Sequence, residues 1–174
     1  MQNIRTEVCV IGSGPGGYVA AIRAGQLGKK VVCVEKAAPG GVCLNVGCIP
    51  SKALISAAKQ WEKLSHLSTM GITVSGQSLD VGKLQDWKGS VVDKLTSGVR
   101  QLIKSAGGQF VAGTATLRDK NTIEVSGPDG NVTITADHII LATGSRPITV
   151  PGFTVDNQRI HDSTGGLSFR TVPR

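Results

Sequence analysis

Aromatic residues are scarce in this sequence: phenylalanine, tryptophan and tyrosine together make up 3% of its 174 residues. Proteins that bind single-stranded nucleic acid stack bases on aromatic side chains beside a groove of gathered positive charge. The chain carries a net charge of +7, from 19 basic and 12 acidic residues, but its basic residues are scattered along the sequence. We therefore rank nucleic-acid binding last among the possible functions and expect no nucleic-acid partner.

Long uninterrupted apolar runs are lacking as well. Glycine, lysine or aspartate interrupts every apolar stretch before it reaches the roughly 20 residues needed to cross a bilayer. The largely polar N-terminal residues lead straight into an apolar strand, without the charged and apolar regions of a leader peptide. We expect a soluble, cytoplasmic protein that does not enter a membrane.

The order of the predicted elements indicates an α/β fold. Apolar runs at 8–11 and 30–34 flank a helix expected over 18–27, which together have the size of one βαβ unit. Apolar residues recur at spacings of three and four over 81–105, which predicts a longer amphipathic helix. The remaining expectations are a loop over 37–49, a helix over 50–67, a strand over 109–112, a small antiparallel β-meander over 115–117, 122–126 and 131–136, and a buried strand over 138–141.

A glycine-rich turn lies between the first strand and the first helix. Residues 12–17 read GSGPGG, which satisfies the GxGxxG pattern. In that pattern the first glycine (Gly12) makes a tight turn, the second (Gly14) lets the backbone approach a pyrophosphate, and the third (Gly17) lets the helix pack on the strand. Glu35 stands at the end of the second strand, where a carboxylate can bind a ribose hydroxyl. A turn needed only for packing would not predict that acidic residue, so we favour a dinucleotide site, although the pattern does not separate FAD from NAD.

Two cysteines, Cys43 and Cys48, are separated by four residues immediately before a predicted helix. A helix N-terminus and the nearby charge of Lys52 both favour the thiolate, so the two thiols are candidates for a reactive redox pair. Two inert buried cysteines or half of a zinc site are the alternatives. Zinc is disfavoured because Cys9 and Cys33 lie in predicted core strands and the three histidines have no ligand-like spacing with the pair.

The cysteine segment carries a family resemblance. Residues 40–52 read GGVCLNVGCIPSK, which fits the GGxCxNxGCxPxK pattern of the pyridine nucleotide-disulfide oxidoreductases. Within them the segment resembles the dihydrolipoamide dehydrogenases more than the glutathione reductases, which usually have lysine where Ser51 stands. GPGGYVAAIRA at 14–24 and ATGSRP at 142–147 are similar to the same group. The resemblance covers essentially the whole sequence and implies a Rossmann-like FAD-binding domain.

The resemblance also implies roles for individual residues. Cys48 would lie beside the isoalloxazine as the charge-transfer thiolate, Cys43 would exchange with a dithiol substrate, and Lys52 would lie near the flavin N5. The implied reaction oxidises protein-bound dihydrolipoamide with NAD as the final acceptor. The residues expected to contact FAD are Gly12, Gly14, Gly17, Glu35, Lys36, Gly40, Gly41, Lys52, Ala115, Thr143, Gly144 and Ser145. No metal is expected.

By the same resemblance, residues 1–150 form the FAD-binding domain with the redox-active disulfide, and 151–174 connect it toward an NAD-binding domain outside this sequence. The catalytic histidine of the family has no counterpart among His66, His138 and His161, so we expect no turnover from this segment alone. In the complete enzyme the implied partners are the lipoyl domains of 2-oxoacid dehydrogenase complexes and a second copy in a homodimer. A glutathione or mercuric reductase, or a non-catalytic FAD-binding module, remain as alternatives.

Overall fold

The computed structural model describes residues 2–172 and divides the chain into two compact units. The first unit comprises the chain up to Asn45 together with Lys94–Arg146, and the second unit comprises Val46–Asp93 together with the chain from Pro147 on. These units are defined by compactness rather than by function. The division that the resemblance implies, at residue 150, therefore stays a prediction.

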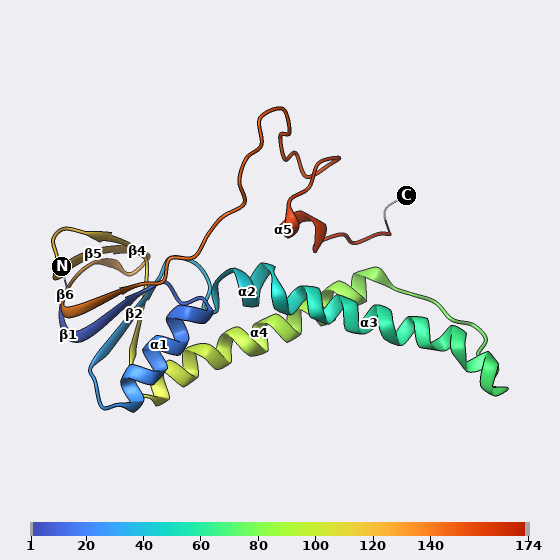
Figure 1. Ribbon diagram of the computed structural model, residues 1–174, viewed down its shortest axis with the longest axis horizontal. Helices are drawn as coiled ribbons and strands as arrows, with labels where there is room; N and C mark the ends of the chain where they lie inside the picture. Colours follow the sequence, from blue (N-terminus) through green and yellow to red (C-terminus); the bar gives the residue numbers. More distant parts are fainter. Residues whose placement is uncertain (1, 173–174) are drawn as a thin grey trace. The chain divides into compact units, whose positions relative to one another are not determined.

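Strands fall in the first unit, and the two longest helices lie wholly or partly in the second (Figure 1). In chain order the elements are β1 (Gln2–Ile11), α1 (Pro15–Gln26), β2 (Val31–Glu35), α2 (Gly41–Val46), α3 (Cys48–His66), the 3-10 helix η1 (Leu67–Met70), α4 (Val81–Ser105), β3 (Gln109–Ala112), β4 (Thr114–Leu117), β5 (Thr122–Gly127), β6 (Gly130–Leu141) and α5 (Ser163–Gly166).

The strands form one six-stranded sheet in the order β3-β2-β1-β6-β5-β4. β3, β2, β1 and β6 are parallel, while β5 and β4 continue the sheet as antiparallel neighbours of β6. The predicted α/β architecture, a parallel sheet with helices and a β-meander, is confirmed. The meander is not a separate layer, because β6 belongs both to it and to the parallel sheet.

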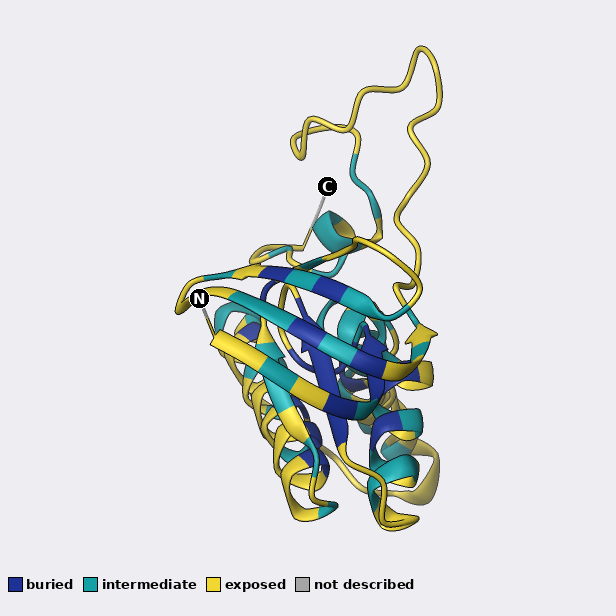
Figure 2. Ribbon diagram, turned by 90° about the vertical axis from the view of Figure 1, so that its left-hand side faces the viewer, coloured by how far each residue is buried: buried dark blue, intermediate teal, exposed yellow. Residues whose placement is uncertain are grey.

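Alternating residues of the strands build the core of the first unit. Cys9, Ile11, Val32 and Val34 lie in one buried cluster with side chains of β5 and β6, as expected when every second residue points to the same face. Buried positions are concentrated on these strands, whereas residues 147–160 are exposed throughout (Figure 2). A side chain on Gly25 of α1 would meet the backbone of Ala106, directly after α4, at 2.2 Å.

The loop expected over 37–49 is wrong in part. Residues Gly41–Val46 form helix α2, and α3 begins at Cys48 rather than at Pro50. Only Gly47 separates the two helices. Six residues are too few to display a helical period, and two glycines at positive φ, Gly40 before the helix and Gly41 as its first residue, lie at its start, so the local sequence favours a loop.

The last strand also differs from expectation. The predicted strands at 131–136 and 138–141 are one continuous strand, β6, and the carboxylate of Asp137, between them, forms an ion pair with Arg5 on the neighbouring β1. The C-terminal end of β6 was expected to be buried. Instead, Ile140 is 38% and Leu141 62% exposed, because only alternate side chains of this end, such as Ile139, pack against the core.

One stretch passes a membrane-span criterion by length and composition alone, contrary to the expectation from uninterrupted runs. It covers Gly41–Met70, with a mean hydropathy of 1.3 over its most apolar window and 17% of that window buried. The stretch is apolar on average although charged residues interrupt it, whereas the expectation considered only uninterrupted apolar runs. A single stretch of this kind is weak evidence, since helices of soluble proteins satisfy the same criterion.

Candidate functional site

The carboxyl ends of the parallel strands carry most of the predicted cofactor residues. The glycine turn follows β1, Glu35 ends β2, and Thr143–Ser145 follow β6. Hydrogen bonds hold the three ends in register: Gly12 N–H donates to Val34 O at 2.8 Å and Ala142 N–H donates to Ile11 O at 2.8 Å. Open α/β sheets bind ligands in the crevice outside these ends.

The three glycines of the turn meet three different spatial requirements. Gly12 has φ +99°, and a side chain there would lie 2.2 Å from Ala142 O. A side chain on Gly17 would lie 1.9 Å from Gly12 O, whereas one on Gly14 would meet nothing within 4 Å. Gly12 and Gly17 are therefore required by the fold itself, while the space beside Gly14 is open.

Helix α1 begins beside that open space. Pro15 occupies its first turn, which contains no acidic residue, and no side chain caps the helix. Proline has no N–H to satisfy, and the N–H groups of Gly16 and Gly17 have no acceptor within the helix. These amides and the helix dipole make the turn suitable for a negatively charged phosphate.

Glu35 is 8% exposed and faces the glycine turn. Its Oε2 accepts hydrogen bonds from Ser13 N–H at 2.8 Å and from Ser13 Oγ at 2.9 Å, and its Oε1 accepts one from Ala37 N–H at 3.0 Å. A carboxylate offers about four acceptor positions, so capacity remains for a ribose hydroxyl. The carboxylate therefore orders the turn in addition to the role expected of it.

A bend between β3 and β4 brings Ala115 toward the same end of the sheet. Gly113, at φ +154°, donates its N–H to Glu35 O at 2.9 Å, and Ala115 follows two residues later, half-buried on β4. Lys36, Thr143, Gly144 and Ser145 are exposed.

Helix α2 contacts the glycine turn through Gly40, which directly precedes it, and through Gly41, its first residue. Gly40 N–H donates to Ser13 O at 2.9 Å, and a side chain on Gly41 would lie 2.7 Å from Gly14 Cα. Cys43, half-buried on α2, therefore belongs to the same unit as the turn. Cys48, the exposed first residue of α3, and Lys52, exposed one helical turn later, belong to the second unit.

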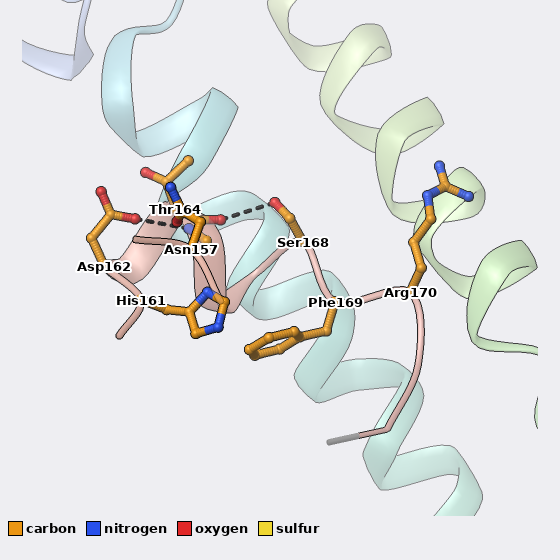
Figure 3. Close-up of a pocket in the computed structure, with 8 residues that line it drawn as sticks. Asn157, His161, Asp162, Thr164, Ser168, Phe169 and Arg170 are labelled. Carbon is orange, nitrogen blue, oxygen red and sulfur yellow. Dashed lines mark hydrogen bonds between the residues drawn. The ribbon is translucent and has the colours of Figure 1, made fainter. Parts of the chain in front are cut away.

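A cavity of about 540 Å³ lies elsewhere, in the C-terminal part of the second unit (Figure 3). His161 and Phe169 meet edge to face there, with ring centroids 4.7 Å apart. Asp162 accepts a hydrogen bond from Gly165 N–H at 2.8 Å and caps α5. The cavity contains none of the predicted site residues.

Comparison with known proteins identifies the family. The family model described as pyridine nucleotide-disulphide oxidoreductase matches residues 6–174. The chain belongs to this family. It is 54% identical over 171 residues to a dihydrolipoyl dehydrogenase of Geobacillus stearothermophilus, covering 98% of this chain and 36% of that protein. A dihydrolipoyl dehydrogenase of Halobacterium salinarum is 47% identical over 171 residues, with 97% and 36% covered.

Solved structures of the family share the fold. The Cu(II) complex of the HOCl-induced flavoprotein disulfide reductase RclA of Escherichia coli superposes with a TM-score of 0.79 at 25% identity, covering 97% of this chain and 35% of that one. LpdA of Mycobacterium tuberculosis has a TM-score of 0.82 at 22% identity, with 98% and 38% covered. The chain thus spans about a third of the length of these relatives, and the family resemblance of the cysteine segment is confirmed.

The two cysteines outside the motif are not part of the site. Cys9 and Cys33 are 0% exposed on neighbouring strands. Burial raises the pKa of the Cys9 thiol to about 11, and burial, followed by the nearby Glu35 carboxylate, raises the pKa of Cys33 to about 12. Both are small core residues, as expected from their strands. Within residues 2–172, no three His, Cys, Asp or Glu side chains gather as a metal site would require.

Sequence reasoning missed two polar residues of this site. Ser13 is a variable position of the glycine pattern, yet its amide and hydroxyl hold Glu35. Asn45 lies between the two motif cysteines, and its side chain bonds the backbone before α2. The asparagine of the family pattern was a signal for Asn45, but its partners become visible only in the folded chain. The contacts of the predicted residues with a cofactor stay predictions.

Proposed function

We propose that this chain is the FAD-binding, redox-active part of a dihydrolipoyl dehydrogenase. The observation that carries the proposal is the direct attachment of the cysteine-bearing helix α2 to the dinucleotide turn. Gly40 bonds Ser13, and Gly41 lies against Gly14. A nucleotide site and a reactive thiol are thereby built into one piece of backbone.

The residues present fit a dinucleotide diphosphate at the glycine turn. The open space beside Gly14, the amides at the start of α1 and the absence of acidic residues from its first turn all favour phosphate. Glu35 would bind the adenosine ribose with its remaining acceptor capacity. Gly40, Gly41, Ala115 and the Thr143–Ser145 segment would supply backbone contacts, with Lys36 and Lys52 beside them.

The two cysteines would perform the thiol chemistry. A thiolate of dihydrolipoamide attacks the Cys43 sulfur of a Cys43–Cys48 disulfide, so that a mixed disulfide forms and Cys48 leaves as a thiolate. The second thiolate of the same substrate molecule then attacks the substrate sulfur that is bonded to Cys43, which releases lipoamide and leaves Cys43 reduced. Two electrons have passed to the protein. Bound FAD would accept this pair and deliver it to NAD.

The remaining functions would belong to a whole protein that is longer than this chain. The matched relatives are about three times as long as the chain. We propose that it uses NAD, acts on lipoyl domains of 2-oxoacid dehydrogenase complexes as a homodimer, and resides in the cytoplasm. No nucleic-acid or membrane partner is proposed. The apolar stretch from Gly41 is attached at its start to the glycine turn, and a folded nucleotide site cannot enter a bilayer with it.

Two alternatives are less well supported. A glutathione reductase usually has lysine at the position of Ser51, and the similarity of 47% to 54% is to dihydrolipoyl dehydrogenases. A mercuric reductase is disfavoured by the same similarity. A non-catalytic FAD module would bind the flavin but would not use Cys43 and Cys48.

An absorption spectrum tests the proposal. The 174-residue chain is incubated with FAD, desalted, and titrated anaerobically with dihydrolipoamide. A retained flavin band that gains long-wavelength charge-transfer absorbance supports it. Cys43→Ser should keep the flavin and stop its reduction by dihydrolipoamide, while Cys48→Ser should abolish the long-wavelength band. Flavin retention with no response to dithiol in any variant would support the non-catalytic module, and no retention would contradict the FAD site.

A further inference from the structure

The side chain of Asn45 ties together the backbone that precedes its own helix. Its Nδ2 donates to Pro39 O at 2.9 Å and to Gly41 O at 2.9 Å. A side-chain amide carries two N–H donors, so these two bonds account for both. The two carbonyls belong to residues on either side of Gly40.

The segment that Asn45 holds has a backbone conformation that requires glycine, and it makes the contacts to the glycine turn. Gly40 and Gly41 have φ +91° and φ +58°, a backbone region that residues other than glycine rarely adopt. Gly40 N–H bonds Ser13 O, and Gly41 lies against Gly14. Any change in the path from Pro39 to Gly41 therefore shifts α2 against the turn.

Helix α2 needs such an anchor because it is short. An isolated helix of six residues lies far below the roughly 12 to 15 residues at which helices become marginally stable in water. Leu44 is its buried residue, and Cys43 lies beside it. The Asn45 side chain, near the C-terminus of this helix, bonds the backbone at the start of the helix. Cys43 lies between these two positions in the sequence.

We propose that Asn45 is a positioning residue, whose amide locks the Pro39–Gly41 backbone and thereby fixes the position of Cys43, on the same short helix, relative to the glycine turn. The consequence for FAD rests on the proposed function, since the turn is where the diphosphate would bind. The consequence for Cys43 does not, because it follows from the backbone contacts alone. Asn45 itself touches no reacting atom in this assignment.

The test replaces Asn45 with alanine and has a matched control in the same unit. Asn121 also bridges two carbonyls with its Nδ2, those of Ala136 at 2.7 Å and Asp137 at 3.4 Å, but it does so in the β-meander. Asn121→Ala removes the same kind of bond without touching α2. Asn45→Ser is the conservative variant: its hydroxyl can reach the carbonyl four residues back, as Ser51 Oγ does with Gly47 O at 2.7 Å.

Two quantities are measured on the full 174-residue chain carrying Cys48→Ser, so that Cys43 is the accessible thiol. The first is the alkylation rate of Cys43 across pH without FAD, followed by mass spectrometry; its high-pH plateau reports access and its midpoint reports the thiol pKa. The second is the dissociation constant for FAD, from quenching of flavin fluorescence. Both quantities are measured at a temperature where all variants remain folded, and Asn121→Ala reports the effect of a general loss of stability.

We expect Asn45→Ala to raise the plateau rate about five-fold or more and to weaken FAD binding about ten-fold. Asn45→Ser should fall between it and the parent, and Asn121→Ala should match the parent. A plateau unchanged in Asn45→Ala, or raised equally in Asn121→Ala, would overturn the proposal. If the parent itself binds no FAD, the proposed cofactor site fails, while the alkylation series still decides the role of Asn45.

Discussion

Single alanine substitutions in the glycine turn should distinguish a glycine that folding requires from a glycine that ligand binding requires. A methyl group at position 17 would lie 1.9 Å from Gly12 O, whereas methyl groups at Gly14 and Gly16 would meet nothing within 4 Å. Gly14→Ala and Gly16→Ala should therefore fold normally. Only at Gly14 does the pattern require the protein backbone to come close to the pyrophosphate of the ligand.

The expected magnitudes follow from these contacts. Gly17→Ala forces backbone apart, and overpacking of this kind costs about 1–3 kcal/mol, of which the better helix propensity of alanine offsets about 0.5–1 kcal/mol. The net loss of about 0.5–2 kcal/mol lowers the unfolding midpoint of a chain of this size by roughly 1–8 °C. Gly14 has φ −66° at the N-cap, a conformation open to alanine, but alanine is the poorer N-cap, so Gly14→Ala should lose about 0.5–1 kcal/mol of stability.

Thermal unfolding by circular dichroism and FAD binding by fluorescence quenching give the two readouts. We expect Gly14→Ala to lose affinity for FAD by about ten-fold or more, equivalent to about 1.4 kcal/mol, while its unfolding midpoint falls by only about 1–4 °C. Gly16→Ala should retain both properties. The reasoning is refuted if Gly14→Ala binds FAD as the parent does, if Gly16→Ala loses affinity equally, or if Gly17→Ala unfolds at the parent's temperature.

Two further predictions concern titrating groups. After reduction of the native chain at pH 8, iodoacetamide should label Cys43 and Cys48 but not the buried Cys9 and Cys33. The pKa values of the two buried thiols, about 11 and about 12, leave roughly one thiol in a thousand or fewer ionised. Label found on either core cysteine by mass spectrometry before denaturation would contradict this. Backbone hydrogen bonds from Gln158, Arg159 and Ile160 lower the pKa of Asp156 from 3.8 to about 2, so the folded state binds the proton less well than the unfolded one. The loop should therefore lose stability as the pH falls through that window. Amide exchange in the loop measured between pH 5 and pH 2 checks this, with Asp156→Asn as the control that should show little pH response.

Elements with a long period or a clear stop were predictable from the sequence. The helix expected over 81–105 has those bounds in the structure, because seven apolar residues repeat at spacings of three and four and a glycine pair ends the pattern. The strand at 109–112 is also as expected. Elements defined by distant partners were not predictable: β1 begins at Gln2 because that polar end pairs with Val132 of β6.

The same distinction applies to the site. The spacing of Gly12, Gly14 and Gly17 predicts three spatial roles, and each glycine has the surroundings that its role requires. Spacing works there because a strand, a turn and a helix follow one another directly. The Asn45 bonds to Pro39 and Gly41 are also local, but they depend on a helix too short to leave a pattern.

Ala115 marks the limit of reasoning from one sequence. Nothing in its local pattern points to a cofactor, and only the family resemblance suggested it. In the structure, Gly113 bonds the backbone oxygen of Glu35, which places the turn into β4 at the carboxyl end of β2. One backbone hydrogen bond therefore connects Glu35, whose carboxylate is expected to bind ribose, to Gly113, which directly precedes the strand that carries Ala115. Residues about 80 positions apart in the chain become neighbours because β2 and β3 are adjacent parallel strands that end together.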